Sequence, residues 1–406
     1  MIYWVVHICI IGGISYLVFR KFHAGIHVYV YSSALIIKLI AGITVGLIFF
    51  NYYGQGDTID FFTKSKSIAA LPWRDYLVKL ASPSNYSTSG QPRVLFFTKI
   101  LSFFTFITGE SYWLSSMYLS LISFFATWYL VTVFVRLSPQ YKPVVIGCFL
   151  YIPTIVFWSS GILKDSLAFG ALLFAIAATV KLYYLRKISI SEFLIFGNSL
   201  FVLLKVKHYL LITYILFVGI LLFLKLISQA SLFSRVVAVI VIAVAIGTTQ
   251  YVHPYLRFNR IALTLYENNQ TIYENSDPEN RLDLFLHAPT VAEIVKSTPS
   301  AIQIGLFRPS IFDKSTIWGW FHRIENTLLA FLFAFSFILY FKLKPKLDTP
   351  MINAAAVAIL LLATMLALST PNFGTLVRYK NAFLPFLFML SSALPYQYLA
   401  SNWKSK

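Results

Sequence analysis

A short acidic segment follows the second long apolar run of the chain and holds residue types suited to acid–base chemistry. It reads Gly54-Gln55-Gly56-Asp57, and a further acid follows at Asp60. A carboxylate placed beside glycines at the end of an apolar run can turn inward and act as a general base on a sugar hydroxyl, or hold a divalent cation. Asp57 and Asp60 are therefore the candidate catalytic residues, and Asp57 is also a candidate metal ligand. The alternative is that Asp57 caps the helix that follows.

Basic residues cluster in three short segments between apolar runs. Lysine and arginine form charge-assisted hydrogen bonds with phosphate oxygens, so these clusters suit a phosphate or a pyrophosphate. The clusters are Lys164 with Asp165; Lys205, Lys207 and His208; and Arg378, Tyr379 and Lys380.

Each basic cluster also has a structural interpretation. Lys164 and Asp165 can form an ion pair that closes a tight turn, with Asp165 capping a helix that starts at Ser166. The other two clusters can extend from the ends of membrane helices toward the polar surface, as long basic side chains often do.

A second polar region, in the C-terminal half, adds Arg308 as a further phosphate-binding candidate. The aromatic residues between Trp318 and Phe321 suit stacking on carbohydrate, although tryptophan is also common at a membrane interface. The candidate phosphate-binding residues are Lys164, Lys205, Lys207, His208, Arg308, Arg378 and Lys380. The candidate substrate-binding residues are Asp165, His322, Glu325 and Tyr379.

The composition places these residues in a membrane protein. Of 406 residues, 58% are hydrophobic and only 12% are charged, whereas about a quarter of a soluble domain is charged. The mean hydropathy is +0.73. The net charge of +18 does not indicate a nucleic-acid partner, because the basic residues are scattered between apolar runs, as in membrane topology signals. Cys9 and Cys148 both lie in apolar runs, which favours packing over a disulfide.

About eleven apolar runs approach the roughly 20 residues that cross about 30 Å of hydrocarbon. The predicted fold is therefore an all-α, polytopic integral membrane protein, with one transmembrane domain over residues 1–406. The predicted spans are 2–19, 28–50, 112–135, 144–158, 166–185, 193–207, 208–227, 235–251, 326–342, 351–369 and 380–400.

The distribution of lysine and arginine predicts the orientation of these spans. With the N-terminus outside, every inner loop is basic and only Glu192 and Asp348 oppose the positive charge, as expected for cytoplasmic loops. Residues 51–111 and 252–325 then form two long extracytoplasmic loops. The apolar segment 94–108 would break this pattern as a span, so we expect an interfacial or re-entrant helix there.

Lys38 lies in the middle of the second predicted span. An unpaired cation at that depth costs about 2.5–3.5 kcal/mol even on the lenient scale. We therefore expect Lys38 to face the interior of the helix bundle and to contact a carboxylate or a carbonyl, and a structural role is favoured over a catalytic one.

The order of these motifs resembles polytopic membrane glycosyltransferases of the GT-C type, which use sugars linked to polyprenyl phosphate. The C-terminal half is similar to bacterial membrane proteins of surface-polysaccharide assembly. The residues that carry the resemblance are 56–62, Pro153 and 158–166 in the first half, and 307–309, 325–326 and 372–379 in the second.

The resemblance implies that Asp57 is the catalytic base or a metal ligand and that basic residues of later loops hold the lipid phosphate. It also implies a polyprenyl-phosphate-linked sugar donor, a lipid-linked or glycan acceptor, and a site facing the periplasm or exterior of a bacterial inner membrane surrounded by its lipids. No certain cofactor follows, and a divalent cation at Asp57 stays open.

Two other functions remain open on the sequence alone. An oligosaccharide polymerase or ligase of the Wzy or O-antigen ligase kind has a similar number of spans, and depends on outer arginines without an acid in the first loop. A flippase or other transporter of lipid-linked sugars is the third, although such proteins often contain internal repeats and charges at mid-membrane, and Lys38 is the one charge found deep in a predicted span.

Overall fold

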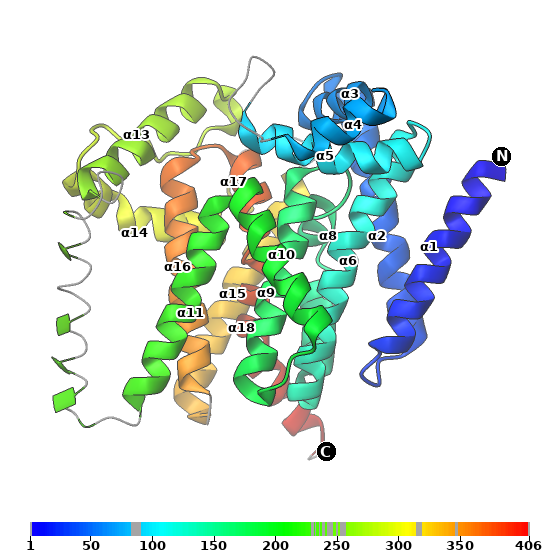
Figure 1. Ribbon diagram of the computed structural model, residues 1–406. Coiled ribbons are helices and arrows are strands. Elements are labelled where there is room, and N and C mark those ends of the chain that lie inside the picture. Colours follow the sequence, from blue (N-terminus) through cyan, green and yellow to red (C-terminus); the bar gives the residue numbers. More distant parts are fainter. Residues whose placement is uncertain are drawn as a thin grey trace. The chain divides into compact units, whose positions relative to one another are not determined.

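The computed structural model describes residues 2–82, 91–228, 257–313, 319–345 and 348–404, with separate positions between 231 and 251 (Figure 1). Across these residues the regular structure is helical and no strand occurs, apart from one isolated bridge between Arg281 and Asn372. The predicted all-α class is confirmed at this level. The chain separates into two compact units, Met1–Ile212 and Thr213–Lys406, and each is described by itself.

Seven of the described helices are long and apolar enough to cross a membrane, which fits a polytopic membrane protein. An eighth candidate is formed by two helices, Phe373–Lys380 and Leu384–Trp403, which are bent by 68° at the break between them. The seven are Ile2–Lys21 (α1), Val28–Tyr53 (α2, Val28–Ile48, with the π-helical turn η1, Phe49–Tyr53), Tyr112–Leu137 (α6), Lys164–Leu185 (α9), His208–Ser228 (α11), Trp320–Leu343 (α15) and Thr349–Ser369 (α16).

The remaining predicted spans differ from this set for local reasons. The run 144–158 divides into α7 (Lys142–Leu150) and α8 (Pro153–Trp158), because a proline disfavours helical geometry in the residue before it. The run 193–207 forms α10 (Ile190–Val206), whose 17 residues are at the lower limit of a span. Most of the run 235–251 lies outside the described residues.

The core of unit 1 is built around α6 and α9. Within their most apolar stretches, 83% of α6 and 67% of α9 are buried, against 17% of α1. Close approach of α2 to α6 depends on Gly42, because a Cβ there would lie 2.4 Å from the Ser120 hydroxyl oxygen. Lys38 faces this interior as expected, but its ammonium donates to the Ser159 hydroxyl, and no carboxylate is among its partners in the described structure.

Three shorter helices of unit 1 occupy the first predicted loop and lie across the upper ends of α2 and α6 in Figure 1: α3 (Asp57–Ala69), α4 (Trp73–Ala81) and α5 (Pro92–Ile107). The hydroxyls of Thr58 on α3 and Tyr112 on α6 are 2.6 Å apart. The rings of Phe61 on α3 and Phe97 on α5 have their centroids 5.2 Å apart. These contacts fix α3 on the end of the bundle.

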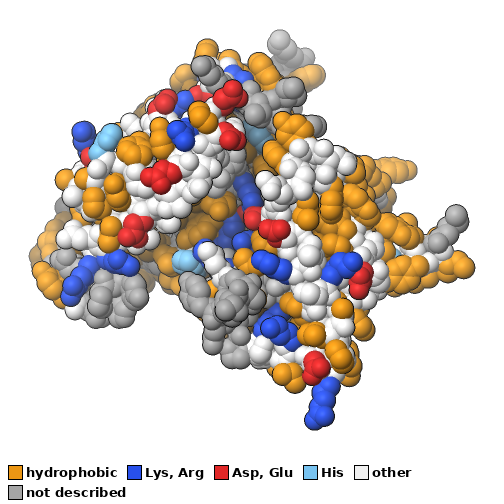
Figure 2. Space-filling model, turned by 90° about the horizontal axis from the view of Figure 1, so that it is seen from above, with side chains coloured by type: hydrophobic (Ala, Val, Ile, Leu, Met, Phe, Trp, Pro, Cys, Tyr) orange, Lys and Arg blue, Asp and Glu red, His pale blue; other side chains and the backbone are white. Residues whose placement is uncertain are grey.

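Unit 2 combines α15 and α16 with α13 (Phe258–Glu274), α14 (Val291–Phe307), α17 (Phe373–Lys380) and α18 (Leu384–Lys404). Helices α13 and α14 both pack on α16, while α15 packs on α18. Asn269 on α13 is buried and donates to the carbonyls of Leu284 and Leu368, which ties the following loop to the end of α16. Acidic side chains are spread over the surface where α13 lies (Figure 2).

Candidate functional site

The sequence-predicted site residues are divided between the two units, so two separate groups have to be considered. Unit 1 carries Asp57, Asp60, Lys164, Asp165, Lys205, Lys207 and His208. Unit 2 carries Arg308, His322, Glu325, Arg378, Tyr379 and Lys380.

Asp57 is the first residue of α3, and the short segment 54–56 separates it from the π-helical turn that ends the second candidate span. Gly54 and Gly56 have φ values of 66° and 132°, which favour glycine and let the chain turn sharply into α3. Gly56 occupies the N-cap position, so the alternative in which Asp57 is the cap is wrong. Asp57 is half-buried and Asp60 is exposed, and both lie in the first turn, where the helix dipole favours negative charge.

Lys164 is held against the same helix. Its ammonium nitrogen lies 4.8 Å from the centroid of the Phe61 ring. Phe61 is four residues after Asp57, and residues four apart lie on one helix face. The structure therefore brings a sequence-predicted phosphate-binding lysine from the start of α9 to the side of α3 that carries Asp57.

Asp165 and Lys207 form a buried ion pair, which joins the first turn of α9 to the C-cap of α10. The side chains are 4% and 10% exposed. The predicted pairing of Asp165 with Lys164 stays a prediction, and the ion pair found for Asp165 is with Lys207. The helix begins at Lys164 with Leu163 at its N-cap, so the prediction that Asp165 caps a helix starting at Ser166 is wrong. Because these charges satisfy each other, Lys207 is better explained as a structural residue than as a phosphate ligand.

Lys205 and His208 are exposed near the junction of α10 and α11. The Lys205 ammonium lies 5.7 Å from the ring centroid of Phe201, one turn earlier in α10. The side chain thus lies along its own helix, as in the alternative interpretation of a lysine that extends along a helix end.

In unit 2, Lys380 is almost completely buried, with 1% of its surface exposed. Its ammonium donates to the carbonyls of Leu306 and Arg308 at 2.9 and 3.0 Å, and to the Asn326 side-chain oxygen at 3.0 Å. An ammonium has three donors, and all three are used. Lys380 therefore stabilises the C-terminal end of α14, where cations are favourable, and a role in phosphate binding is not supported by these contacts.

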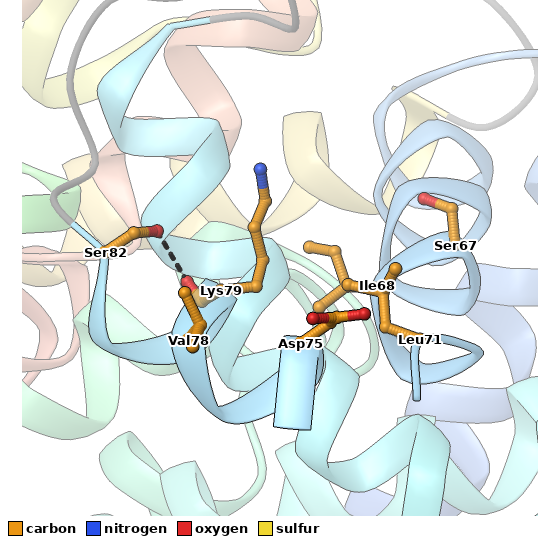
Figure 3. A pocket seen from close by; sticks show the side chains of 7 residues that line it. All are labelled: Ser67, Ile68, Leu71, Asp75, Val78, Lys79 and Ser82. Atoms are coloured by element: carbon orange, nitrogen blue, oxygen red, sulfur yellow. Dashed lines mark hydrogen bonds between the residues drawn. The ribbon is translucent and has the colours of Figure 1, made fainter. Parts of the chain in front are cut away.

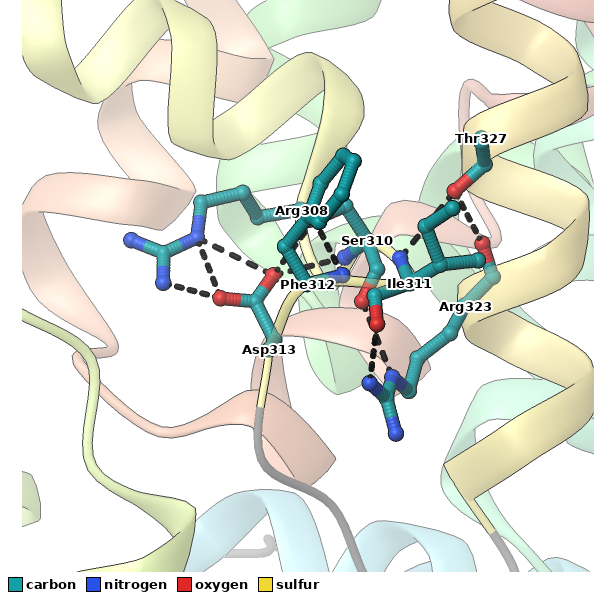
Figure 4. A network of polar contacts seen from close by, with 7 residues as sticks. All are labelled: Arg308, Ser310, Ile311, Phe312, Asp313, Arg323 and Thr327. Atoms are coloured by element: carbon teal, nitrogen blue, oxygen red, sulfur yellow. Dashed lines mark hydrogen bonds and ion pairs between the residues drawn. The ribbon is translucent and has the colours of Figure 1, made fainter.

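Arg308 is bound by a residue that the sequence reasoning missed. Its guanidinium forms a bidentate ion pair with Asp313, and Asp313 also accepts from the Ser310 backbone N–H at 2.6 Å (Figure 4). Burial opposes ionisation of Asp313, but the bonds from Arg308 and Ser310 outweigh it and hold the pKa of that carboxyl below its usual range. The same pair raises the pKa of Arg308. The sequence did offer one indication of this pair, because Arg308 and Asp313 have opposite charges and are only five residues apart.

Arg323 secures the other side of this loop. Its guanidinium donates to the Ser310 carbonyl at 2.9 Å and to the Ile311 carbonyl, and it lies 4.5 Å from the centroid of the Trp320 ring. The loop between α14 and α15 is thus held by two arginines whose donors are directed at protein groups (Figure 4).

The other unit 2 candidates lie on the helices around this loop. His322 is buried in the first turn of α15, with its ring centroid 3.8 Å from that of Phe321. Glu325 follows on the same helix and is half-buried, as are Arg378 and Tyr379 on α17. The predicted substrate-binding roles of His322, Glu325 and Tyr379 stay predictions, as does the predicted phosphate-binding role of Arg378.

Among the described residues, no group of three or more histidine, cysteine or acidic side chains is placed to hold a metal ion. Asp57 and Asp60 therefore remain a pair, and a divalent cation bound there would need additional ligands from water or substrate.

In comparisons with known proteins, no family model, no curated protein and no solved structure matched the chain.

Proposed function

We propose that the chain is a membrane glycosyltransferase that moves a sugar from a polyprenyl-phosphate-linked donor to a hydroxyl acceptor at the extracytoplasmic face, in the synthesis of a surface polysaccharide or glycolipid. One observation carries the proposal. Lys164 lies over Phe61, on the side of α3 that carries the half-buried Asp57. An acid on α3 and a cation from the start of α9 are thus found on the same side of α3, just after the second candidate span.

The chemistry assigned to these two residues is complementary. Asp57 takes the proton of the acceptor hydroxyl as its oxygen bonds to the anomeric carbon. The bond between that carbon and the phosphate oxygen breaks, and the electron pair leaves with the polyprenyl phosphate. Lys164 stabilises the negative charge that develops on this leaving group.

The surroundings of Asp57 suit a donor carried by a lipid. Helix α3 begins where the apolar helix α2 and its π-helical turn end, so a phosphate at the membrane surface would reach it without leaving the bilayer. The sequence also lacks a nucleotide-binding glycine motif, and a lipid-borne donor needs none.

The test is sugar transfer by the purified full-length protein in lipid nanodiscs, with a radiolabelled polyprenyl-phosphate sugar. We expect Asp57→Asn to lower the transfer rate by about 10²–10⁴-fold, the usual contribution of a general base. Asp60, the second candidate acid, is exposed in the same turn, so Asp60→Asn tests whether it shares the role, and we expect a smaller loss than for Asp57→Asn.

Unchanged transfer by Asp57→Asn would overturn the assignment of the base. If Arg308 and Arg378 proved indispensable while both acids did not, the polymerase or ligase function would replace this proposal. Movement of the lipid-linked sugar without bond formation would favour a transporter.

A further inference from the structure

An open cavity of about 550 Å³ lies between the end of α3 and one face of α4 (Figure 3). Asp57 is at the other end of α3. Its volume falls within the range of small-molecule sites, about 300–1,000 Å³. The residues that line it are Ser67, Ile68, Leu71, Asp75, Val78, Lys79 and Ser82.

The wall formed by α4 is held in place by α5. Tyr76 of α4, which is not part of the cavity lining, is 3% exposed, and its ring stacks on Phe106 of α5 with a centroid distance of 5.9 Å. At the end of α4, the buried Lys99 of α5 donates to the Ser82 carbonyl at 2.6 Å and to its hydroxyl at 3.1 Å. The cavity is therefore bounded by a helix fixed at both its middle and its end.

Two opposite charges lie one turn apart on the cavity wall without pairing. Asp75 and Lys79 are four residues apart on α4, a spacing at which an acid and a lysine commonly interact. None of the ion pairs within the described ranges joins them. Figure 3 shows the Lys79 side chain extending away from the Asp75 carboxylate. A carboxylate and an ammonium are thus presented separately to whatever enters the cavity.

Two apolar residues of the lining are exposed: Val78 retains 65% of its accessible surface and Leu71 retains 36%. Outside the lining, α4 also exposes Trp73, which retains 63%, and Leu77. Short amphipathic helices with exposed tryptophan and aliphatic residues are typical of segments that lie in the membrane interface, where lipid headgroups meet acyl chains.

We propose that this cavity binds the headgroup of an amine-bearing phospholipid, phosphatidylethanolamine. Lys79 takes the phosphate through a charge-assisted hydrogen bond, and Asp75 takes the primary ammonium of the same headgroup. The acyl chains leave over Leu71 and Val78. An anionic lipid without an amine satisfies Lys79 alone and leaves Asp75 facing a phosphate. The site is separate from the proposed glycosyltransferase chemistry and does not depend on it.

The test is lipid retention by the full-length protein in detergent, measured by native mass spectrometry with equimolar phosphatidylethanolamine and phosphatidylglycerol. We expect the ethanolamine lipid to be retained in excess by about threefold, the scale of one exposed ion pair. Asp75→Asn should abolish this excess, and Lys79→Gln should weaken retention of both lipids. Soluble phosphoethanolamine at the same concentration should be retained less than the lipid, because it lacks the apolar contacts.

Two variants serve as matched controls. Lys64→Gln removes an exposed lysine of α3 outside the cavity, and Glu267→Gln removes an exposed acid of unit 2. Both should keep the wild-type preference. Equal retention of the two lipids by the wild type, a preference for phosphatidylglycerol, or an unchanged preference in Asp75→Asn would each overturn the proposal.

Discussion

In unit 1 the half-buried candidate acid Asp57 is on the side of α3 where Lys164 packs on Phe61. A separate buried pair, Asp165 with Lys207, joins two helices. In unit 2 the cations around the α14–α15 loop are bound to protein groups, and Lys380 has all three donors in use. In unit 1, the charged residues with a structural role are therefore different from the candidate functional ones. In unit 2, the charged residues whose contacts are known stabilise a loop. Basic residues at span ends are therefore not equivalent evidence for ligand binding.

The largest effect is expected at the ion pair of unit 1. Asp165→Asn leaves the Lys207 ammonium buried without its counter-charge, so we expect a loss of about 3–5 kcal/mol in the free energy of unfolding. Unfolding in mixed micelles of SDS and non-ionic detergent measures it. The double variant Asp165→Asn/Lys207→Met should recover much of the loss, because no buried charge is then left alone. If Asp165→Asn lowered the free energy of unfolding by less than about 1 kcal/mol, the pair would behave like an exposed salt bridge. Water would then reach it, and our expectation would be wrong.

A smaller loss is expected at Lys380 in unit 2. Lys380→Met removes the donors to Leu306, Arg308 and Asn326, and unsatisfied buried acceptors destabilise by about 2–3 kcal/mol in total. The exposed Arg260 of α13 is the control, and Arg260→Gln should change stability by less than about 0.5 kcal/mol. If Lys380→Met were as stable as the control but lost transfer activity, Lys380 would be a ligand-binding residue after all.

Stability of the α14–α15 loop should depend on pH through Asp313. The pKa of this carboxyl is lowered in the folded protein, so its stabilisation is complete above its unfolded pKa of about 3.9 and is lost as the pH falls through the folded pKa. We expect wild type to lose more stability than Asp313→Asn on acidification from about pH 5, because only wild type has this carboxylate to protonate. Asp277→Asn, at an exposed acid, should follow wild type. Parallel curves for wild type and Asp313→Asn would contradict this assignment.

The smallest change in stability is expected at Lys164. Its contact with Phe61 is a cation–π interaction of about 0.5–1 kcal/mol at a partly exposed site, so Lys164→Gln should unfold almost as wild type does. The same variant should bind the polyprenyl-phosphate donor more weakly, by about tenfold for one charge-assisted hydrogen bond. If Lys164→Gln bound the donor as tightly as wild type does, Lys164 would not belong to the proposed site. The cations of unit 1 would then be structural, as those of unit 2 are.

Hydrophobic run length predicted most of the candidate spans, since a continuous apolar run of about 20 residues has few alternatives to a membrane helix. It failed to anticipate the division at Pro153, where two short helices replace one predicted span. It also gave no indication of the bend between α17 and α18, which separates Lys380 from the following helix.

For the candidate site, the sequence alone determined which residue types occur and that an acid follows the second apolar run. Only the tertiary structure decided their partners. Asp165 pairs with Lys207, 42 positions away, and Lys380 reaches carbonyls more than 70 positions away. Local sequence determines helix length and the acid at a helix start, because those depend on neighbouring residues. A buried charge is satisfied only if the packing of distant helices brings a suitable group within hydrogen-bond distance. The composition of the chain does not predict which groups are brought together.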